Sequence, residues 1–558
     1  MVPVTISFVR WFLILSYEII MMSIAKELLR AFVIFNLLVI FARSEYGSAL
    51  VDLEPLLITK EKIVETIDHY INLEVQRLDK IKRLAQDYDN LYKTASEDID
   101  NFLSNPINSY LLVKRLTTDW KFVMHLVEGY ASKVPIYQLV KDEIFPNDYD
   151  LEEVANSVIR LQETYLLNTT DLVKGKVAGF KGDTELTASD CFELGMNAYN
   201  ETDYNLALLW FQQSLDRLDT DEFQMVYKPK LLEYLSFSAF KVNDMELALK
   251  LTKDLIKIDP RYPGVNNNFY FYKKEVLRKR KESPDPKSKE VTEAIVDESE
   301  DGRIDPNLID VKRYKQLCRG EQLRTPEQER KLKCRYTSNG SKYLLLHPVK
   351  EETLNLDPLI VVYHDVIRDN DIEFLKDMAE DIGLERATVL NASTGILEYA
   401  KYRTSKSCWL QDNKHPRIKH ISMMIEEISG LEMDTAEDLQ MNKYGLGGHY
   451  LGHYDFKREG EFDPFAKFGT GNRMATWMFY LSDVKAGGST VFPDIDVEIK
   501  PRKGSAALWL NLFKSGEGDL RTKHAACPVI AGKKWVANKW IHERGQEFRR
   551  PCDLNPLA

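Results

Sequence analysis

The chain has 558 residues, which is too long for one hydrophobic core and predicts roughly two to four domains. Apolar residues make up 44% and charged residues 29% of the composition, so we expect a globular protein and not an intrinsically disordered one. The 75 Lys and Arg against 86 Asp and Glu give a net charge of −11, which argues against nucleic acid as the main partner, because phosphate binding requires a basic face.

The N-terminus is apolar but is interrupted by charged residues. Residues 31–42 follow Arg30 and lead into Ala-Arg-Ser, in the order of charged start, apolar middle and small-residue exit that is typical of a secretory signal. We therefore predict a signal peptide region over residues 1–44, with Met21 or Met22 as alternative start sites. A signal anchor formed by residues 4–22 is the competing interpretation.

Residues 45–180 are predicted to form a helical N-terminal domain that could mediate dimerisation. Within residues 60–92, apolar side chains recur every three or four positions and mark one face of a long helix, while charges fill the other face. The apolar positions are Ile67, Ile71, Val75, Leu78, Ile81, Ala85, Tyr88 and Tyr92. Such a face can pair with a second copy or can simply cover its own domain, and the second case is the commoner one.

Residues 185–275 are predicted to form a domain of helical hairpins of the tetratricopeptide type. Leu194, Gly195, Ala207 and Phe211 have the required spacing, in which small residues let two helices approach and a large one fills the gap. Ala207 and Ala248 are 41 residues apart, which is longer than the usual repeat and predicts an extended helix or loop in the first hairpin.

The same segment is rich in aromatic residues at helical spacing, among them Tyr199, Tyr204, Tyr234 and Phe237. Such residues more often belong to a core than to a binding surface. On the concave face of a repeat, however, tyrosines suit a polyproline II ligand, whose rings stack on them and whose carbonyls accept the phenol hydrogen.

Residues 276–305 are charged and proline-punctuated and are predicted to form a linker. After it, residues 306–558 contain short β-rich runs separated by Gly and Pro, which predicts a closed or sandwiched antiparallel β domain. The expected strands are residues 359–363, 476–481, 506–513 and 534–541, with a flanking helix over residues 371–380.

The sequence contains four Asn-x-Ser/Thr sequons, at Asn168, Asn200, Asn339 and Asn391, which are candidate glycosylation sites in an extracytoplasmic compartment.

The six cysteines include no Cys-x-x-Cys pair, so they favour an oxidising compartment over a zinc site. We expect disulfides between Cys318 and Cys334 and between Cys527 and Cys552, each of which would close a short loop. Cys191 and Cys408 would then be buried thiols.

His453 is the only histidine followed two residues later by a carboxylate, Asp455. On a strand this spacing puts both side chains on one face, so both can bind one metal ion. His524, before a predicted strand, is the best third ligand, and two histidines with one carboxylate and open positions are the set expected for iron(II). A zinc site on His449 and His453 is disfavoured, because the surrounding glycines make a helix improbable.

Lys534 enters a predicted strand ten residues beyond His524. A lysine inside an apolar β domain is costly unless it meets an anion, and a dicarboxylate co-substrate would provide one. A salt-bridged structural lysine is the alternative.

Several ordered blocks of this sequence are similar to the α subunit of animal collagen prolyl 4-hydroxylases over nearly all of the mature length. The blocks are Tyr314–Glu321, Arg403–Ser407 before Trp409, Tyr444-Gly445, Ala475–Val484, Gly487–Pro493, Ser515–Asp519, His524–Pro528 and Trp540–Cys552. The resemblance implies a multidomain α+β protein whose C-terminal domain is a double-stranded β-helix, or jelly roll.

The same resemblance implies iron(II) on His453, Asp455 and His524, with the distal carboxylate of 2-oxoglutarate on Lys534, O2 as the second co-substrate and ascorbate as a protective cofactor. Tyr444, Arg473 and Thr490 are further candidates for the catalytic pocket. The implied partner is protein disulfide isomerase in an α2β2 tetramer in the endoplasmic reticulum lumen, and the implied substrate is proline in X-Pro-Gly repeats of procollagen.

In the helical domain, the resemblance implies a peptide groove on Tyr199, Tyr204 and Tyr234, with Phe237 where a tyrosine is expected. The sequence also departs from the family at His449 and at Leu451-Gly452, where Gln and Glu-Pro are usual. Two alternatives stay open: a collagen-binding or assembly subunit with weakened catalysis, and a hydroxylase of other proline-rich proteins.

Overall fold

The computed structural model describes residues 54–97, 148–181, 185–219, 226–282, 311–391, 394–466 and 468–556, with the single positions 123, 126 and 138. The chain divides into two compact units, of which the first holds residues 1–44 and 52–147 and the second residues 45–51 and 148–558. The predicted signal region, residues 1–44, lies outside the described residues. Among the helices that are described, none combines the length and the apolarity needed to cross a bilayer.

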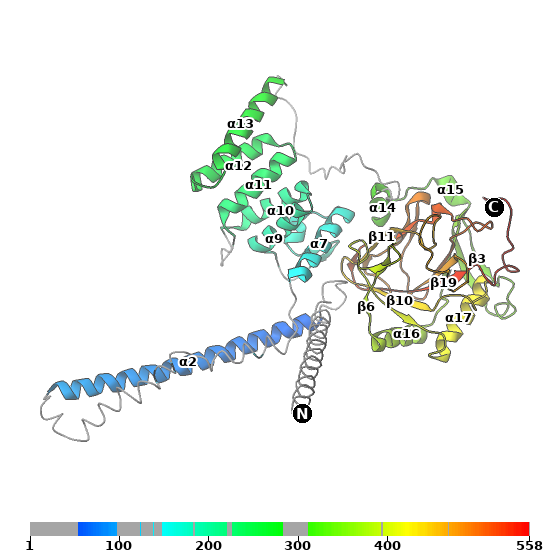
Figure 1. The fold of residues 1–558 in the computed structure, drawn as a ribbon, viewed down its shortest axis with the longest axis horizontal. Helices are drawn as coiled ribbons and strands as arrows, with labels where there is room; N and C mark the ends of the chain where they lie inside the picture. The colour runs from blue at the N-terminus through cyan, green and yellow to red at the C-terminus, as the bar shows by residue number, and fades with distance from the viewer. Residues whose placement is uncertain are drawn as a thin grey trace, which may run out of the picture. The chain divides into compact units, whose positions relative to one another are not determined.

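The first unit contains the long helix α2, Glu54–Glu97, which confirms the helix predicted over residues 60–92 (Figure 1). Its apolar stripe is largely open, with Ile67, Val75 and Leu78 exposed by 44%, 52% and 55%. This exposure leaves the stripe available to a partner helix, and self-association through it stays a prediction.

The first described elements of the second unit are α7, Asp148–Tyr165, and α8, Thr169–Val173, followed by a small hairpin of β1, Lys176–Val177, and β2, Phe180–Lys181. Asn168 caps α8 by accepting a hydrogen bond from the backbone of Asp171. Apolar side chains of α7 and α8, which belong to the predicted N-terminal domain, share a core with the helices that follow.

The helical hairpins occur where they were predicted, and their helices are α9, Ala188–Asn200; α10, Tyr204–Arg217; α11, Lys228–Lys241; α12, Met245–Ile258; and α13, Val265–Glu282. A Cβ atom on Gly195 would lie 2.5 Å from the ring of Phe211, so the small residue does admit the large one as expected. Helix α10 ends at Arg217 and α11 begins only at Lys228, and this long interval accounts for the long repeat spacing.

The start of the predicted linker at residue 276 is wrong, because α13 continues to Glu282. Tyr272 and Val276 on this helix are only 2% and 6% exposed. Because burial of these side chains stabilises the helix, it continues into the charged sequence that follows. The rest of the predicted linker lies outside the described residues.

The C-terminal domain is built on a nine-stranded antiparallel sheet. In spatial order its strands are β3, Cys334–Thr337; β4, Val349–Leu356; β5, Leu359–His364; β16, Ala506–Leu510; β12, Arg473–Tyr480; β19, Lys534–His542; β10, Leu439–Tyr444; β9, Lys406–Leu410; and β6, Glu385–Arg386. The predicted strands 359–363, 476–481 and 534–541 are confirmed, while the strand predicted over 506–513 ends at Leu510.

A second, four-stranded sheet completes the jelly roll, in the order β11, Tyr450–His453; β17, His524–Ala526; β14, Thr490–Phe492; and β15, Val497–Ile499. Two small two-stranded sheets accompany it, β13, Ala486–Gly487, with β18, Val529–Ala531, and β7, Val389–Leu390, with β8, Leu397–Glu398. Single 3-10 turns follow at Pro493–Ile495 and Leu520–Thr522.

The helices of this domain are α14, Val311–Cys318; α15, Pro326–Arg330; α16, Asp369–Ile382; and α17, Pro416–Ser429. Helices α16 and α17 cover one face of the large sheet, and their apolar residues share a core with it (Figure 1). On β12, Trp477 and Phe479 belong to that core, whereas the alternate residues Met478 and Tyr480 belong to the core between the two sheets. The period of two along the strand thus separates a structural face from an inner face that carries the site.

The predicted disulfides are wrong, because Cys318 is bonded to Cys527. The two cysteines are separated by 209 positions in the sequence, so a preference for short loops cannot find this pairing. It forms because α14 packs beside β14 and β17, in an apolar cluster that contains both cysteines. Cys334 and Cys552 are exposed thiols, and Cys191 and Cys408 are buried as predicted.

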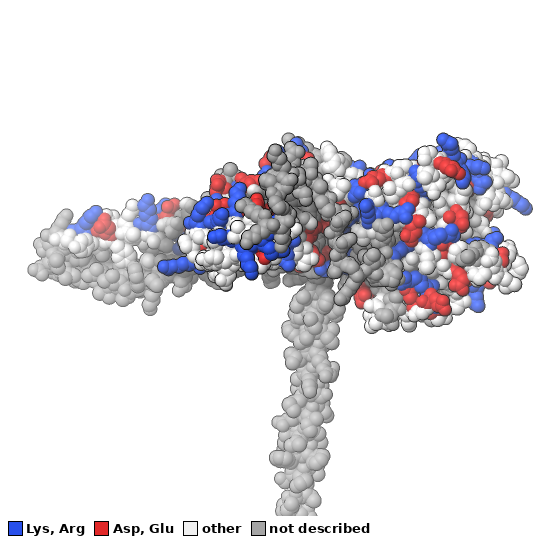
Figure 2. Space-filling view, turned by 90° about the horizontal axis from the view of Figure 1, so that it is seen from above, with Lys and Arg blue, Asp and Glu red and all other residues white. Residues whose placement is uncertain are grey.

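Three of the four sequon asparagines, Asn168, Asn200 and Asn339, are exposed, and Asn391 is half-buried. The side-chain amide of Asn339 donates to the carbonyl of Ile428. Glycosylation stays a prediction at these positions. On the face seen in Figure 2, basic and acidic side chains are interspersed over the described residues.

Peptide mapping of the non-reduced chain tests the observed pairing. We expect one cross-linked species that joins the peptides containing Cys318 and Cys527, because their Cα atoms are 5.5 Å apart. Cys191→Ser is the matched control and should leave the map unchanged. Recovery of Cys318 linked to Cys334 would contradict this assignment.

Candidate active site

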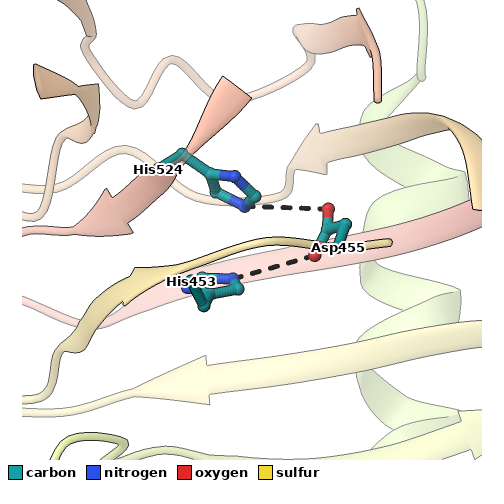
Figure 3. A group of neighbouring side chains, drawn as sticks. All are labelled: His453, Asp455 and His524. Carbon is teal, nitrogen blue, oxygen red and sulfur yellow. Dashed lines mark ion pairs between the residues drawn. The ribbon is translucent and has the colours of Figure 1, made fainter. Parts of the chain in front are cut away.

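The candidate ligands are brought together by the pairing of β11 with β17. His453 lies directly opposite His524 in this antiparallel pair, and the ring centroids are 4.3 Å apart. Strand β11 ends at His453, so Asp455 lies just beyond the strand. The prediction that both residues lie on one strand is therefore wrong. The carboxylate nevertheless turns toward both imidazoles (Figure 3).

The three side chains form a compact group. Asp455 Oδ1 is 3.7 Å from His453 Nε2, and Asp455 Oδ2 is 3.6 Å from His524 Nε2. Each imidazole donates its Nδ1 hydrogen to the carbonyl two residues earlier, His453 to Leu451 at 2.9 Å and His524 to Thr522 at 3.0 Å. These bonds fix the tautomers and leave both Nε2 lone pairs facing the carboxylate, as metal ligation requires.

The carboxylate of Asp455 also accepts a hydrogen bond from strand β12. Thr476 donates to Asp455 Oδ2 at 2.7 Å, and Asn511 donates to the same threonine hydroxyl at 2.9 Å. Burial alone would raise the pKa of Asp455, but the neighbouring His524 and His453 lower the pKa below its usual value. The carboxylate is therefore ionised at neutral pH and available as a ligand.

Burial, together with His524, lowers the pKa of His453 to about 3. The imidazole is neutral at physiological pH, which is the form that binds a metal ion. Aromatic rings supply this apolar environment: Tyr450 stacks on His453 with centroids 3.6 Å apart, and Trp509 lies edge-on to His524 at 4.8 Å.

Lys534 is 1% exposed and projects from the first position of β19 into the same cavity. Its Nζ donates to Thr490 Oγ1 at 3.2 Å, and that oxygen also accepts from the Tyr480 hydroxyl at 2.9 Å. Burial lowers the pKa of Lys534 to about 7. Among the described residues this buried amine contacts a hydroxyl and no carboxylate, which favours an anion-binding role over the structural salt bridge.

The cavity that joins these groups is lined by Arg403, Tyr444, Tyr450, His453, Asp455, Met478, Thr490, Trp509, His524, Ala526, Lys534, Val536 and Asn538. Tyr444 and Thr490 therefore line the cavity, as predicted. Arg403, Trp509 and Asn538 were missed as individual site residues, although Arg403 stands in one of the matched sequence blocks.

Arg473 is the pocket candidate that does not line the cavity. It forms a two-point ion pair with Glu437, at 2.5 and 2.8 Å, and donates to the backbone carbonyl of Asp455 at 3.2 Å. Although burial opposes ionisation, Arg473 and His542 lower the pKa of Glu437 to about 2. Arg473 thus supports the ligand-bearing segment from outside the pocket.

The residues present fit an octahedral ion with open positions and a polar co-substrate. Two imidazole nitrogens and one carboxylate oxygen, all within 4.8 Å of one another, form the set preferred by non-haem iron(II). Arg403 Nε, Trp509 Nε1 and Asn538 Oδ1 on the cavity wall have no hydrogen-bond partner among the described residues. Buried polar atoms of this kind call for a polar molecule in the cavity.

His449, the ligand of the competing zinc interpretation, does not join the group. It is 2% exposed, and its Nδ1 is 2.8 Å from the hydroxyl of Thr404. Strand β11 begins after it, so the helical spacing that a zinc site would need is absent from this described segment.

The predicted groove residues form one aromatic cluster on the helical hairpins. Tyr199 contacts Tyr204, Tyr234 and Phe237 with ring centroids 5.5, 5.0 and 5.8 Å apart. All four rings are half-buried, so each presents part of its surface to solvent. This is the combination of rigidity and access that a polyproline II ligand requires.

Comparison with known proteins agrees with this geometry. Residues 49–179 match the prolyl 4-hydroxylase alpha-subunit N-terminal region, residues 188–279 the prolyl 4-hydroxylase peptide-substrate-binding domain, and residues 439–542 the 2OG-Fe(II) oxygenase superfamily. The human prolyl 4-hydroxylase subunit alpha-1 is 42% identical over 517 residues, which cover 90% of this chain and 94% of the human one. The Caenorhabditis elegans subunit alpha-2 is 40% identical over 533 residues, covering 94% and 96%.

The chain belongs to the prolyl 4-hydroxylase alpha-subunit family. Its C-terminal domain is a 2-oxoglutarate- and iron(II)-dependent dioxygenase domain in which His453, Asp455 and His524 form the iron site. Its helical hairpins form a peptide-substrate-binding domain, which supports the binding of proline-rich peptides.

The ligand assignment is tested with two neighbouring histidines. We expect His524→Ala to lose bound iron and at least about 100-fold in turnover, because loss of a ligand should exceed the 10- to 100-fold cost of losing an outer-sphere partner. His449→Gln, the matched control, should retain iron. Metal analysis and succinate release measure both, and an iron-depleted His449→Gln would contradict the assignment.

The low pKa of Lys534 predicts a pH-dependent affinity for 2-oxoglutarate. The empty site loses its charge as pH rises through about 7, whereas a bound dicarboxylate favours the ammonium form and raises the pKa. Affinity should be full below pH 7 and should fall above it by up to about tenfold per pH unit. Anaerobic titration with iron(II) present measures this slope.

Lys534→Arg provides the control for this titration, because a guanidinium stays protonated over the whole range. Its pH profile should be flat wherever that of the unmodified chain slopes. Equal slopes for the two proteins would mean that another group titrates and that the low pKa of Lys534 plays no part.

Proposed function

We propose that this chain hydroxylates C4 of prolines that precede glycine in collagen-like polypeptides. O2 and 2-oxoglutarate would be consumed, with one oxygen atom delivered to proline and the other to succinate as CO2 leaves. The observation that carries the proposal is the convergence of His453, Asp455, His524 and Lys534 on one cavity.

Each residue has a distinct part in this activity. Iron(II) held by His453, Asp455 and His524 would supply the redox chemistry that activates O2. Lys534 would bind the distal carboxylate of 2-oxoglutarate, with the Thr490 hydroxyl beside it. The aromatic walls formed by Tyr450 and Trp509 would limit access of water to the reacting atoms.

The substrate proposal rests on the aromatic cluster of the helical hairpins. Tyr199, Tyr204 and Tyr234 combine exposed ring faces with phenol groups, which suit the rings and carbonyls of an extended proline-rich chain. Phe237 offers stacking without a hydroxyl, and Lys241 lies 5.4 Å from the centre of its ring. Because Phe237 lacks the hydroxyl donor of a tyrosine, we expect the relative affinities for different peptides to change. The ligand should still be an extended proline-rich chain.

We also infer that the chain works in the endoplasmic reticulum lumen with protein disulfide isomerase, in an α2β2 tetramer. A disulfide between Cys318 and Cys527 is compatible with an oxidising compartment. The exposed apolar stripe of α2 is a candidate surface for association between α subunits.

Co-expression with protein disulfide isomerase, followed by turnover on a Pro-Pro-Gly repeat peptide with ascorbate, tests this function. We expect equal succinate and 4-hydroxyproline, with the hydroxyl on the proline before glycine. A Pro-Ala-Gly repeat is the control and should give no hydroxyproline. Peptide binding without product would indicate a collagen-binding subunit with weakened catalysis. Hydroxyproline formed only in secreted non-collagen proteins would indicate that the substrates are other proline-rich proteins.

A further inference from the structure

Helix α7 is buried on opposite faces, with Glu153, Ser157 and Leu161 all 4% exposed and Gln162 fully buried. One face belongs to the helical hairpins. There the side chain of Gln162 accepts from Trp210 Nε1 of α10 at 2.8 Å and donates to Thr169 at 2.7 Å. A buried side chain satisfied in this way fixes α7 to the hairpins.

The other face of α7 contacts the loop that leads into the strand of the first iron ligand. Arg160 donates to the carbonyl of Gly447 at 2.9 Å. Ser157 lies so close that a Cβ atom on Gly447 would be 2.5 Å from its own, and Gly447 has a φ of +65°. The contact therefore needs glycine for both space and backbone conformation.

The last residue of α7 contacts the segment that follows the strand of the third ligand. The hydroxyl of Tyr165 donates to the carbonyl of Pro528 at 2.6 Å. Pro528 comes four residues after His524 and directly after Cys527, whose disulfide to Cys318 fixes the same segment to α14. Arg319, next to Cys318, donates to the carbonyl of Thr164 on α7 at 3.1 Å.

These two segments are also bonded to each other. Gly447 donates its backbone hydrogen to Val529 at 2.8 Å, and Val529 donates to Gly448 at 3.1 Å. The outer ends of β11 and β17 therefore form one unit, to which α7 contributes one side-chain bond on each side. The register of these two strands sets His453 opposite His524.

We propose that Arg160 and Tyr165 are positioning residues, which hold the outer ends of the two ligand-bearing strands in register from helix α7. They touch neither ligand, and they act through the backbone of Gly447 and Pro528. The inference rests on the proposed hydroxylase function for its turnover assay but not for its metal-binding assay.

Tyr165→Phe and Arg160→Lys test this role in the full chain co-expressed with protein disulfide isomerase. Both are conservative enough to keep α7 packed. We expect iron(II) to bind about three- to tenfold more weakly to Tyr165→Phe, the usual effect of one lost hydrogen bond. The ratio of succinate to hydroxyproline should rise, because a displaced site oxidises 2-oxoglutarate without hydroxylating proline.

Arg160→Lys keeps the charge and should recover most of the iron affinity that Arg160→Ala loses. Two controls, Glu152→Ala on the exposed side of α7 and Tyr336→Phe on exposed β3, should match the unmodified chain. The visible absorption of the anaerobic iron(II)–2-oxoglutarate complex should change in Tyr165→Phe and stay constant in both controls.

A purely structural role for α7 would lower the yield of folded protein without moving the product ratio, the iron affinity or the absorption band. Unchanged values of all three in Tyr165→Phe and Arg160→Ala would overturn the proposal. If the unmodified chain fails to hydroxylate the Pro-Pro-Gly peptide, the proposed function fails, while the iron affinities still decide the positioning role.

Discussion

The site depends on one pairing, in which His453 on β11 stands opposite His524 on β17. Both imidazoles donate Nδ1–H to the carbonyl two residues earlier in their own segment, so the same local device orients each ring. The two Nε2 atoms then converge from paired strands, and the carboxylate of Asp455 provides the third ligand. A one-residue slip would turn one imidazole to the far face of the sheet, because side chains alternate along a strand.

Side chains alternate between the two faces along the strands of the large sheet as well, and this alternation positions the other residues of the site. On β12, Thr476 faces the site and bonds Asp455, while Trp477 packs against the helical side. On β19, Lys534 and Asn538 line the cavity, while Trp535 belongs to the opposite core. Helices α16 and α17 thus stabilise the sheet on one face and leave the other face free to hold a buried amine, a carboxylate and two imidazoles.

Sequence patterns predicted the residues that carry strong local signals. The His-x-Asp pair, the lone His524 before a strand, Lys534 and the small-large spacing around Gly195 and Phe211 could all be read from spacing and residue type. The disulfide partner of Cys318 could not, because it depends on α14 packing against β17 across 209 residues. The roles of Arg403 and Asn538 in the cavity depend equally on tertiary packing. Arg473 was wrongly placed in the pocket, because its ion pair with the distant Glu437 could not be read from the sequence.

Anomalous diffraction at the iron edge, from crystals grown without oxygen in iron(II) and 2-oxoglutarate, tests the central claim most directly. The account predicts one iron bound by the Nε2 atoms of His453 and His524 and by one oxygen of Asp455, with the remote carboxylate of 2-oxoglutarate on Lys534 Nζ. Iron bound by His449, or a fourth protein ligand that closes the open positions, would contradict it.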